Sequence, residues 1–560
     1  MKNLICSLYL AAAMYAAGGD TQLPDAAMQG DRESVHALLK KHADVNAAQG
    51  DGMTALHWAA AKDDLEMARL LIAAGANVKA ANRVAAVTPL SLAATNGNAA
   101  MIAILLQAGA DPNAATTDGA TPLMAAAASG SAESVATLLD HGAQINATES
   151  ARGQTALMFA AAKNRAAAIQ VLLQHKADPA VTTKVVKLEK PKFDEDGNPI
   201  VERKVKPGTQ LDPATAAAMA RRVTASVIGG MTALLLASRN GHMDAVRALV
   251  EGGANVNQVS AGDKSSPIVI AICNGHYDLA KYLLDHGADP NIATMDGLAA
   301  LYAVIDTQWA PFGWSANPIT NQERITYLEL MKALLDRGAD PNARLTRLLW
   351  FRPTSHNQMW IGSAGSTPFW RAAQATDLPA MHLLIEKGAD PKIASTEGVT
   401  PLMVAAGLGW NGNYSKNAPT SALDAVRYCL ELGLDPTPKD VQGFTALAGA
   451  AYRGDNELVK LLVEKGAKMD VRTVRGWSVT DMANGPSLRS SVPMKHPETV
   501  ALLVQLGAPP LTAVEGEEIL GIIRRRPATA ANKPGADTPP PDKPAPAAIP
   551  AQAAPGSIQP

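Results

Sequence analysis

The chain has 560 residues, with 47% hydrophobic but only 4% aromatic residues. Its 50 basic and 52 acidic residues nearly balance, so no strong positive field attracts phosphate backbones, and nucleic-acid binding is disfavoured. A single conventional core is excluded, because such cores stop growing at about 250–300 residues. A one-dimensional stack of repeats escapes this limit, since each unit packs only on its neighbours.

The N-terminal sequence, MKNLICSLYLAAAMYAAGGD, places Lys2 before an uncharged run over residues 4–17 and small residues after that run. This order is typical of a secretory signal peptide cleaved near Gly18, and the run is too short to span a bilayer comfortably. We expect a signal peptide over residues 1–19, a periplasmic or secreted mature protein, and no integral membrane span. An ordinary buried first helix is the alternative.

A short block of the form Thr/Ser-x-Leu followed by small residues recurs along the chain. Successive copies are mostly 33 or 34 residues apart, and three longer intervals mark insertions. A fixed period of this length is the sequence signature of a repeat architecture. The copies begin at Thr54, Thr88, Thr121, Thr155, Thr232, Ser266, Ala299, Thr367, Thr400, Thr445 and Ser478.

Each copy predicts two short helices. The Thr or Ser is a good N-cap, and the Pro that often follows it suits the first helical turn. A glycine such as Gly97 ends the first helix, and a second helix follows with a Leu pair such as Leu105–Leu106. This helix closes on Gly-Ala-Asp-Pro-Asn, as from Gly109, and Asp-Gly pairs mark a tight projecting turn between copies.

This pattern resembles the ankyrin repeat family, whose unit of about 33 residues is a β-turn and two helices. The resemblance covers residues 21–510 and implies a mostly α solenoid of about twelve helix-turn-helix units with short projecting β-hairpin turns. The expected member is a multi-repeat, exported bacterial protein. Only the copy at Thr54 keeps the family's His, at His57, so other copies lose its hydrogen bond to Thr. Trp370 occupies the His position in its own copy and is expected to pack between helices.

The longest interval contains an insertion whose first part, KVVKLEKPKFDEDGNPIVERKVKPG, alternates apolar and charged residues around a turn at 196–198. This alternation predicts a β-hairpin. The following DPATAAAMARR predicts a helix, because Asp212 is a good N-cap and Pro213 suits the first turn. We expect either a solvated decoration of a projecting turn or a charged contact surface.

The other insertions, at 305–323, 345–364 and 407–421, concentrate large aromatic side chains. Six of the eight Trp residues fall between residues 309 and 410, across three adjacent units. These rings either bind a partner, as clustered aromatics do in binding hot spots, or form small cores for their own loops. The candidate partner-binding residues are Trp309, Phe312, Trp314, Trp350, Trp360, Trp410 and Tyr414.

The two ends of the repeat region predict caps. Residues 21–46 are interpreted as a cap that keeps the second helix but not the full first part of the repeat. At the other end, VEGEEILGIIRRR has acids early and arginines late, the order that a helix dipole favours, and predicts a terminal helix. The expected organisation is a signal peptide (1–19), N-terminal repeats (20–180), a hairpin-plus-helix insertion (181–229), C-terminal repeats (230–510), a capping helix (511–526) and a disordered Pro/Ala-rich tail (527–560).

The sequence contains no motif for catalysis, a cofactor or a metal. Gly-x-Ser-x-Gly, His-Glu-x-x-His and Gly-Lys-Ser/Thr are all missing, and no Cys-x-x-Cys-His could attach haem. The histidines occupy framework positions, and Cys273 and Cys429 lie too many units apart to form a disulfide. We therefore expect no catalytic residue, no cofactor and no metal site.

The resemblance to ankyrin repeats implies a non-catalytic module that binds a protein partner of unknown identity. Binding is expected through the concave face of the solenoid and the loop insertions. One alternative is a periplasmic scaffold or accessory subunit for exported redox or cell-envelope enzymes. An enzyme with a pocket lined by the aromatic loops is a further alternative.

Overall fold

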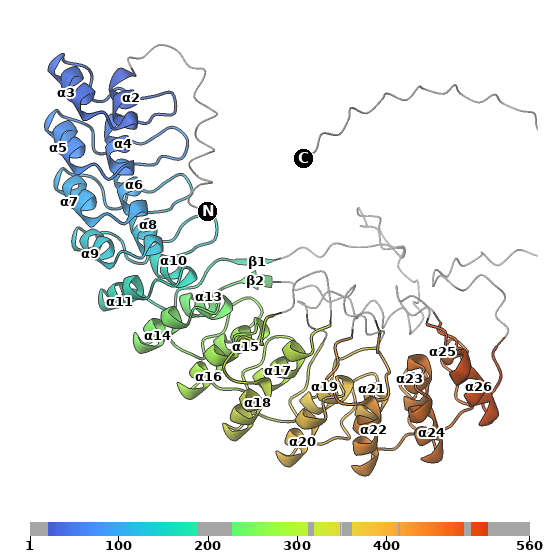
Figure 1. Cartoon of the computed structure of the whole chain (residues 1–560). Coiled ribbons are helices and arrows are strands. Elements are labelled where there is room, and N and C mark those ends of the chain that lie inside the picture. Colours follow the sequence, from blue (N-terminus) through green and yellow to red (C-terminus); the bar gives the residue numbers. More distant parts are fainter. Residues whose placement is uncertain are drawn as a thin grey trace, which may run out of the picture. The chain divides into compact units, whose positions relative to one another are not determined.

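A computed structural model of the protein describes residues 21–187, 227–311, 318–347, 349, 361–412, 415–486 and 494–512 (Figure 1). Within these ranges the polypeptide forms 24 helices in consecutive antiparallel pairs, together with one two-stranded sheet. The prediction of an ankyrin solenoid of about twelve helix pairs is confirmed.

Each unit consists of a first helix and a second helix. The first helices are α2 (Gln22–Gln29), α4 (Ala55–Ala61), α6 (Pro89–Asn96), α8 (Pro122–Ser129), α10 (Ala156–Ala162), α13 (Ala233–Arg239), α15 (Pro267–Cys273), α17 (Ala300–Gln308), α19 (Pro368–Gln374), α21 (Pro401–Ala405), α23 (Ala446–Arg453) and α25 (Val479–Ala483). The second helices are α3 (Arg32–Lys40), α5 (Leu65–Ala73), α7 (Ala99–Gln107), α9 (Ala132–Asp140), α11 (Ala166–Gln174), α14 (Met243–Glu251), α16 (Tyr277–Asp285), α18 (Tyr327–Asp336), α20 (Leu378–Glu386), α22 (Ala422–Glu431), α24 (Asn456–Glu464) and α26 (Pro497–Gln505).

Polar side chains that cap the helices set where they begin. The Thr88 hydroxyl accepts from the backbone N–H of Ser91 at 3.2 Å, and Pro89 follows at the first position of α6. The second helices use carboxylates or amides in the same way, as Asp64 accepts from the N–H of Met67 at 3.0 Å. These caps satisfy backbone donors that a helix leaves without a partner at its N-terminus.

The first helices contact one another in unbroken order from α2 to α25. Small side chains at these contacts let neighbouring helices approach closely. The core therefore runs along the stack as a single hydrophobic cluster rather than gathering at one centre. Pairs of fully buried alanines mark the contacts at Ala59–Ala60, Ala93–Ala94, Ala126–Ala127 and Ala160–Ala161.

Consecutive projecting turns are joined by backbone hydrogen bonds. Arg83 donates its N–H to the carbonyl oxygen of Asp51 at 2.7 Å, and near the far end Val474 donates to Gln442 at 2.8 Å. Asn side chains add a second link between units. The Asn291 amide donates to the carbonyl oxygen of Gly338 at 2.8 Å, and its oxygen accepts from the N–H of Asp340 at 2.8 Å.

The first unit contains both helices, whereas the cap interpretation predicted only the second. Residues 22–29 form a first helix although the Thr21 side chain makes no cap, because Leu23, Ala26 and Ala27 recur at helical spacing and bury one face. In the first insertion, β1 (Val185–Lys187) pairs antiparallel with β2 (Val227–Gly229), so the strands lie at the insertion's two ends.

The insertion does not interrupt the stack. The helices that flank it in sequence, α10 and α13, contact each other directly. The turn predicted at 196–198, the helix predicted from Asp212, the signal peptide and the Pro/Ala-rich tail lie outside the described residues. So does the capping helix predicted for 511–526, apart from its first two residues.

The His position links neighbouring units. His57 accepts the backbone N–H of Thr54 at Nδ1 (3.1 Å), and its Nε2 lies 3.0 Å from the carbonyl oxygen of Val87 in the next unit. Trp370, at the same position, is fully buried and donates its indole N–H to the carbonyl oxygen of Val399 at 2.9 Å. The expectation that Trp370 packs between helices is met, and the ring also supplies the bond to the next unit.

Candidate functional site

Trp309, at the C-terminal end of α17, is buried, with 7% of its surface exposed. Its indole N–H donates to the Asp377 carboxylate at 2.7 Å, and the Tyr327 hydroxyl donates to the same carboxylate at 3.1 Å. The Trp309 and Tyr327 rings meet edge to face with centroids 5.8 Å apart. This burial matches the interpretation of Trp309 as loop core, and it leaves the ring little surface for a partner.

A buried ion pair fixes the same insertion to the next unit. The Arg371 guanidinium in α19 lies 3.0 Å from the Asp306 carboxylate in α17, and it donates to the carbonyl oxygen of Trp309 at 2.7 Å. The buried Asp377 carboxylate also caps α20 by accepting from the N–H of Ala380 at 3.1 Å. Burial raises the pKa of this carboxyl. The start of the insertion is therefore held by charge-assisted hydrogen bonds in a region of low dielectric.

Trp410 follows α21 and is half-buried. The Arg453 guanidinium carbon lies 5.0 Å from the centre of its ring. Lys416 in the same insertion lies 5.6 Å from the Trp309 ring and donates to the carbonyl oxygen of Gln308 at 2.8 Å. Both indoles line one small pocket, which we call the indole pocket. Its lining also includes Pro311, Arg371, Gln374, Val404, Leu408, Gly409, Ser415, Lys416 and Asn417.

The structure thus brings two of the seven candidate residues together, Trp309 and Trp410. The other five lie outside the described residues, and their partner-binding role stays a prediction. These five are Phe312, Trp314, Trp350, Trp360 and Tyr414.

A row of apolar side chains runs along the first helices α4, α6, α8, α10, α13 and α15. Each member lies four residues after the capping Thr or Ser, and all but the buried Leu236 are half-buried. Sequence reasoning missed this row, although its members always directly follow the His position and could have been found from that spacing. We call these residues the apolar row: Trp58, Leu92, Ala125, Phe159, Leu236 and Ile270.

The same position is buried in every unit from Ala299 onward. Insertion residues lie over it in three of these units: Arg371 and Val404 line the indole pocket, and a Cβ atom on Gly449 would come within 2.6 Å of the backbone nitrogen of Leu408. The accessible part of the row is therefore confined to the units before Ala299. The buried counterparts are Ala303, Arg371, Val404, Gly449 and Met482.

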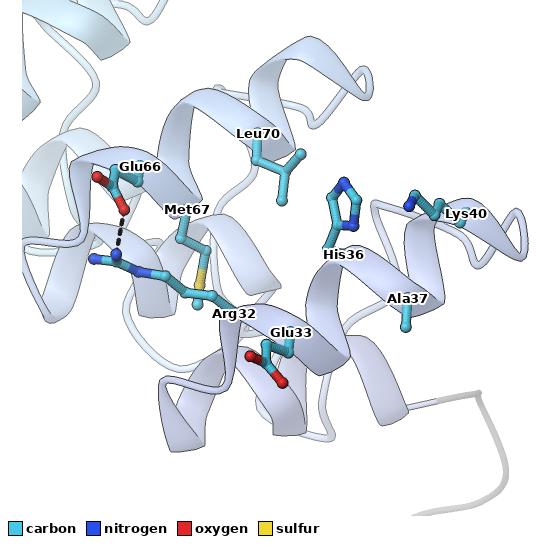
Figure 2. Close-up of a pocket in the computed structure, with 8 residues that line it drawn as sticks. All are labelled: Arg32, Glu33, His36, Ala37, Lys40, Glu66, Met67 and Leu70. Atoms are coloured by element: carbon cyan, nitrogen blue, oxygen red, sulfur yellow. Dashed lines mark hydrogen bonds and ion pairs between the residues drawn. The ribbon is translucent and has the colours of Figure 1, made fainter.

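An open groove of about 450 Å³ lies between α3 and α5. Arg32 reaches across it to Glu66 (Figure 2). Arg32 also pairs with Asp64 at 2.8 Å. Met67 lies beside Arg32, and Leu70 faces the α3 side of the groove near His36 (Figure 2). Of the two acids that line the groove, Glu66 pairs with Arg32, so the acids do not converge on a reacting centre.

The described residues contain no cluster of three or more His, Cys, Asp or Glu that could hold a metal ion. In the same ranges, no helix has the length and apolar character needed to cross a membrane. Cys273 and Cys429 form no disulfide, and burial raises the pKa of Cys429 to about 12. A protonated, buried thiol is a weak nucleophile.

Known proteins are similar to this chain through its repeats. A rat protein, ankyrin repeat and SAM domain-containing protein 6, is 33% identical over 91 residues, 16% of this chain and 9% of the relative. The Arabidopsis thaliana E3 ubiquitin-protein ligase KEG is 27% identical over 283 residues, 47% of this chain and 16% of the relative. Protein PhlB of Serratia liquefaciens is 44% identical over 73 residues, 13% of this chain and 32% of the relative. The protein thus spans a third or less of the length of these relatives.

The family model for ankyrin repeats in three copies matches residues 23–116, 90–183, 211–294 and 369–473. These matches cover more than half of the sequence, and they coincide with the helix pairs, caps and projecting turns described above. The chain belongs to the ankyrin repeat family.

Proposed function

We propose that this protein binds another protein through the apolar row and the loop insertions, without catalysing a reaction. Ankyrin repeats are protein–protein interaction modules and are generally non-catalytic. The observation that carries the proposal is the apolar row itself. Its large side chains, Trp58, Leu92 and Phe159, stay partly exposed on helices that are already fixed by stacking.

A partner that covers this row would take little conformational freedom from the protein. The Trp58 indole N–H donates to the Gln49 side chain at 2.9 Å, which fixes the ring before any contact. Burial of pre-ordered aromatic and aliphatic side chains is the usual source of affinity in protein interfaces.

The aromatic insertions extend this proposal to the C-terminal units. Trp309 anchors its insertion rather than meeting the partner, while Trp410 is half-buried beside an open pocket. We propose that Trp410 and the remaining candidates, Phe312, Trp314, Trp350, Trp360 and Tyr414, supply a second contact region.

We further propose that the partner is met outside the cytoplasm. The support is the order of charge, apolar run and small residues over residues 1–19. Fractionation of producing cells tests this: export predicts the processed protein in the periplasm or medium, and full-length protein retained in the cytoplasm contradicts it.

Crosslinking with mass spectrometry on the native host tests the binding function. The double variant Leu92→Ala with Phe159→Ala should lose the crosslinks that the wild type forms. The matched control is Leu139→Ala with Leu173→Ala, because these residues are equally half-buried but lie on the second helices α9 and α11. Equal crosslinks in both double variants would contradict a role for the apolar row. One recurrent partner indicates a receptor, and several indicate a scaffold.

A further inference from the structure

Two cationic side groups lie against the two indole rings of the indole pocket. The Lys416 ammonium is 5.6 Å from the Trp309 ring centre, and the Arg453 guanidinium is 5.0 Å from the Trp410 ring centre. Cation–π contacts stabilise such groups but leave their charge in place.

Neither cation has a carboxylate partner among the described residues. Lys416 donates to the carbonyl oxygen of Gln308, which carries no net charge, and Arg453 makes no ion pair there. The nearest acid to Arg453 in sequence, Asp455, favours its charged form but is engaged as the cap of α24. Burial lowers the pKa of both Lys416 and Arg453, as expected for cations moved out of water without full compensation.

The buried acids of this region are already used. Asp306 pairs with Arg371 at 3.0 Å, and Asp377 accepts from Trp309 and Tyr327. Neither has its charge directed at Lys416 through an ion pair. The pocket therefore presents an excess of positive charge, and an anion from outside would complete it.

The small volume of the indole pocket limits the size of the anion that it can bind. Its cavity volume is about 20 Å³, close to the space that one water molecule needs, about 10–15 Å³. One carboxylate oxygen is about the size of a water molecule, so a carboxylate can place one oxygen in this space while the stem that carries it lies beside the half-buried Trp410 ring. A planar carboxylate fits this requirement better than a bulkier tetrahedral phosphate, and it forms charge-assisted hydrogen bonds with an ammonium group.

We propose that the indole pocket binds a carboxylate of the protein partner, with Lys416 as the direct donor and Arg453 as a supporting charge on Trp410. The carboxylate belongs to an Asp or Glu residue or to the C-terminus of the partner polypeptide. That the carboxylate belongs to a protein rests on the proposed function. That the ligand is a carboxylate rests only on the size and charge of the indole pocket.

Fluorescence anisotropy with labelled peptides and the full-length protein tests this. Acetylated, amidated hexaglutamate offers only the carboxylates of its Glu residues, hexaglutamine with a free C-terminus offers only the terminal one, and amidated hexaglutamine offers neither. We expect one of the first two to bind and the third not to bind. Lys416→Gln with Arg453→Gln should weaken that binding about tenfold or more.

Lys460→Gln is the matched control, because Lys460 lies on α24, is exposed and already pairs with Glu457 at 3.0 Å. It should leave peptide binding unchanged. Lys416→Arg retains the charge and should keep most of the binding, which separates loss of charge from loss of the loop's structure. Equal binding by the wild type and the Lys416–Arg453 variant, or tighter binding of a phosphoserine peptide than of both carboxylate peptides, would overturn the proposal. If peptide binding fails while partner crosslinks persist, the proposed function stands without this site.

Discussion

Trp370 donates its indole N–H to the carbonyl oxygen of Val399 at 2.9 Å, in the place where His57 reaches Val87 at 3.0 Å. An indole and an imidazole therefore make the same side-chain-to-backbone contact between neighbouring units. Forming this contact takes an N–H donor on a rigid ring of suitable reach, and copies with Met124 or Val269 at the same position stack without it.

This equivalence predicts the effect of substitutions at Trp370. Trp370→Phe keeps most of the packing but removes one of the two donors to the Val399 carbonyl, which still accepts from the N–H of Ser395 at 2.9 Å, and should cost about 0.5–1.5 kcal/mol. Trp370→Ala also opens a cavity and should cost about 3–5 kcal/mol. Urea unfolding followed by circular dichroism measures both. Trp477→Phe, at a half-buried indole, is the control and should cost less than Trp370→Phe. Equal losses from the two Phe substitutions would contradict the bonding role.

The burial of Asp377 predicts a pH dependence. Because burial raises the pKa of this carboxyl in the folded state, its titration contributes stability that is fully present below the unfolded pKa, about 3.9. That contribution is lost as pH rises through the folded pKa. The stability of the wild type relative to Asp377→Asn should therefore fall from acidic to neutral pH. Denaturation of both proteins across this range measures the difference, and a difference that grows with pH would contradict the assignment.

The Asn links between units predict a small, local stabilisation. Asn291→Ala removes one bond to Gly338 and one from Asp340, and should lower the free energy of unfolding by about 1 kcal/mol. Lys79 occupies the same position in its own unit, and its side chain makes no such link. Lys79→Ala is therefore the control and should be nearly neutral. Similar losses from both substitutions would show that the position, and not the amide, matters.

The close approach of the insertion to α23 predicts sensitivity at Gly449. A Cβ atom there would lie 2.6 Å from the backbone nitrogen of Leu408, so Gly449→Ala should displace the insertion and cost about 1–3 kcal/mol despite the better helix propensity of Ala. Ala125 occupies the same position in a unit where no insertion lies over the helix, and there the methyl group is accommodated. Trp fluorescence and unfolding measure the effect, and a gain in stability would contradict this contact.

Local sequence signals were enough to predict the repeat. The Thr88 cap, Pro89 and Gly97 each act within one helix, so the boundaries of α6 follow from a few neighbouring residues. Repetition of these signals then identified the helix pairs. The first helix of the first unit was missed although Thr21-Gln22-Leu23 and Ala26-Ala27 match the repeated block and Thr21 lies 33 residues before Thr54.

The candidate site could be predicted only in part. Aromatic clustering in the insertions was visible in the sequence, and it located the region of the indole pocket. The burial of Trp309 was not, because it depends on Asp377, 68 residues further along the sequence. Nor was the position of Lys416, whose ammonium meets the carbonyl oxygen of Gln308 across 108 residues.

The sequence by itself determined the unit, its caps, the order of stacking and the places where insertions interrupt it, because all of these rest on contacts within one unit or between neighbours. Only the tertiary structure decided which side of the stack stays open to a partner. The described parts of the insertions at 305–323 and 407–421 lie against Arg371 and Val404, which are buried, while Phe159 and Leu92 remain accessible. That choice depends on buried charge pairs and ring contacts between distant segments, and such pairings leave no periodic trace in the sequence.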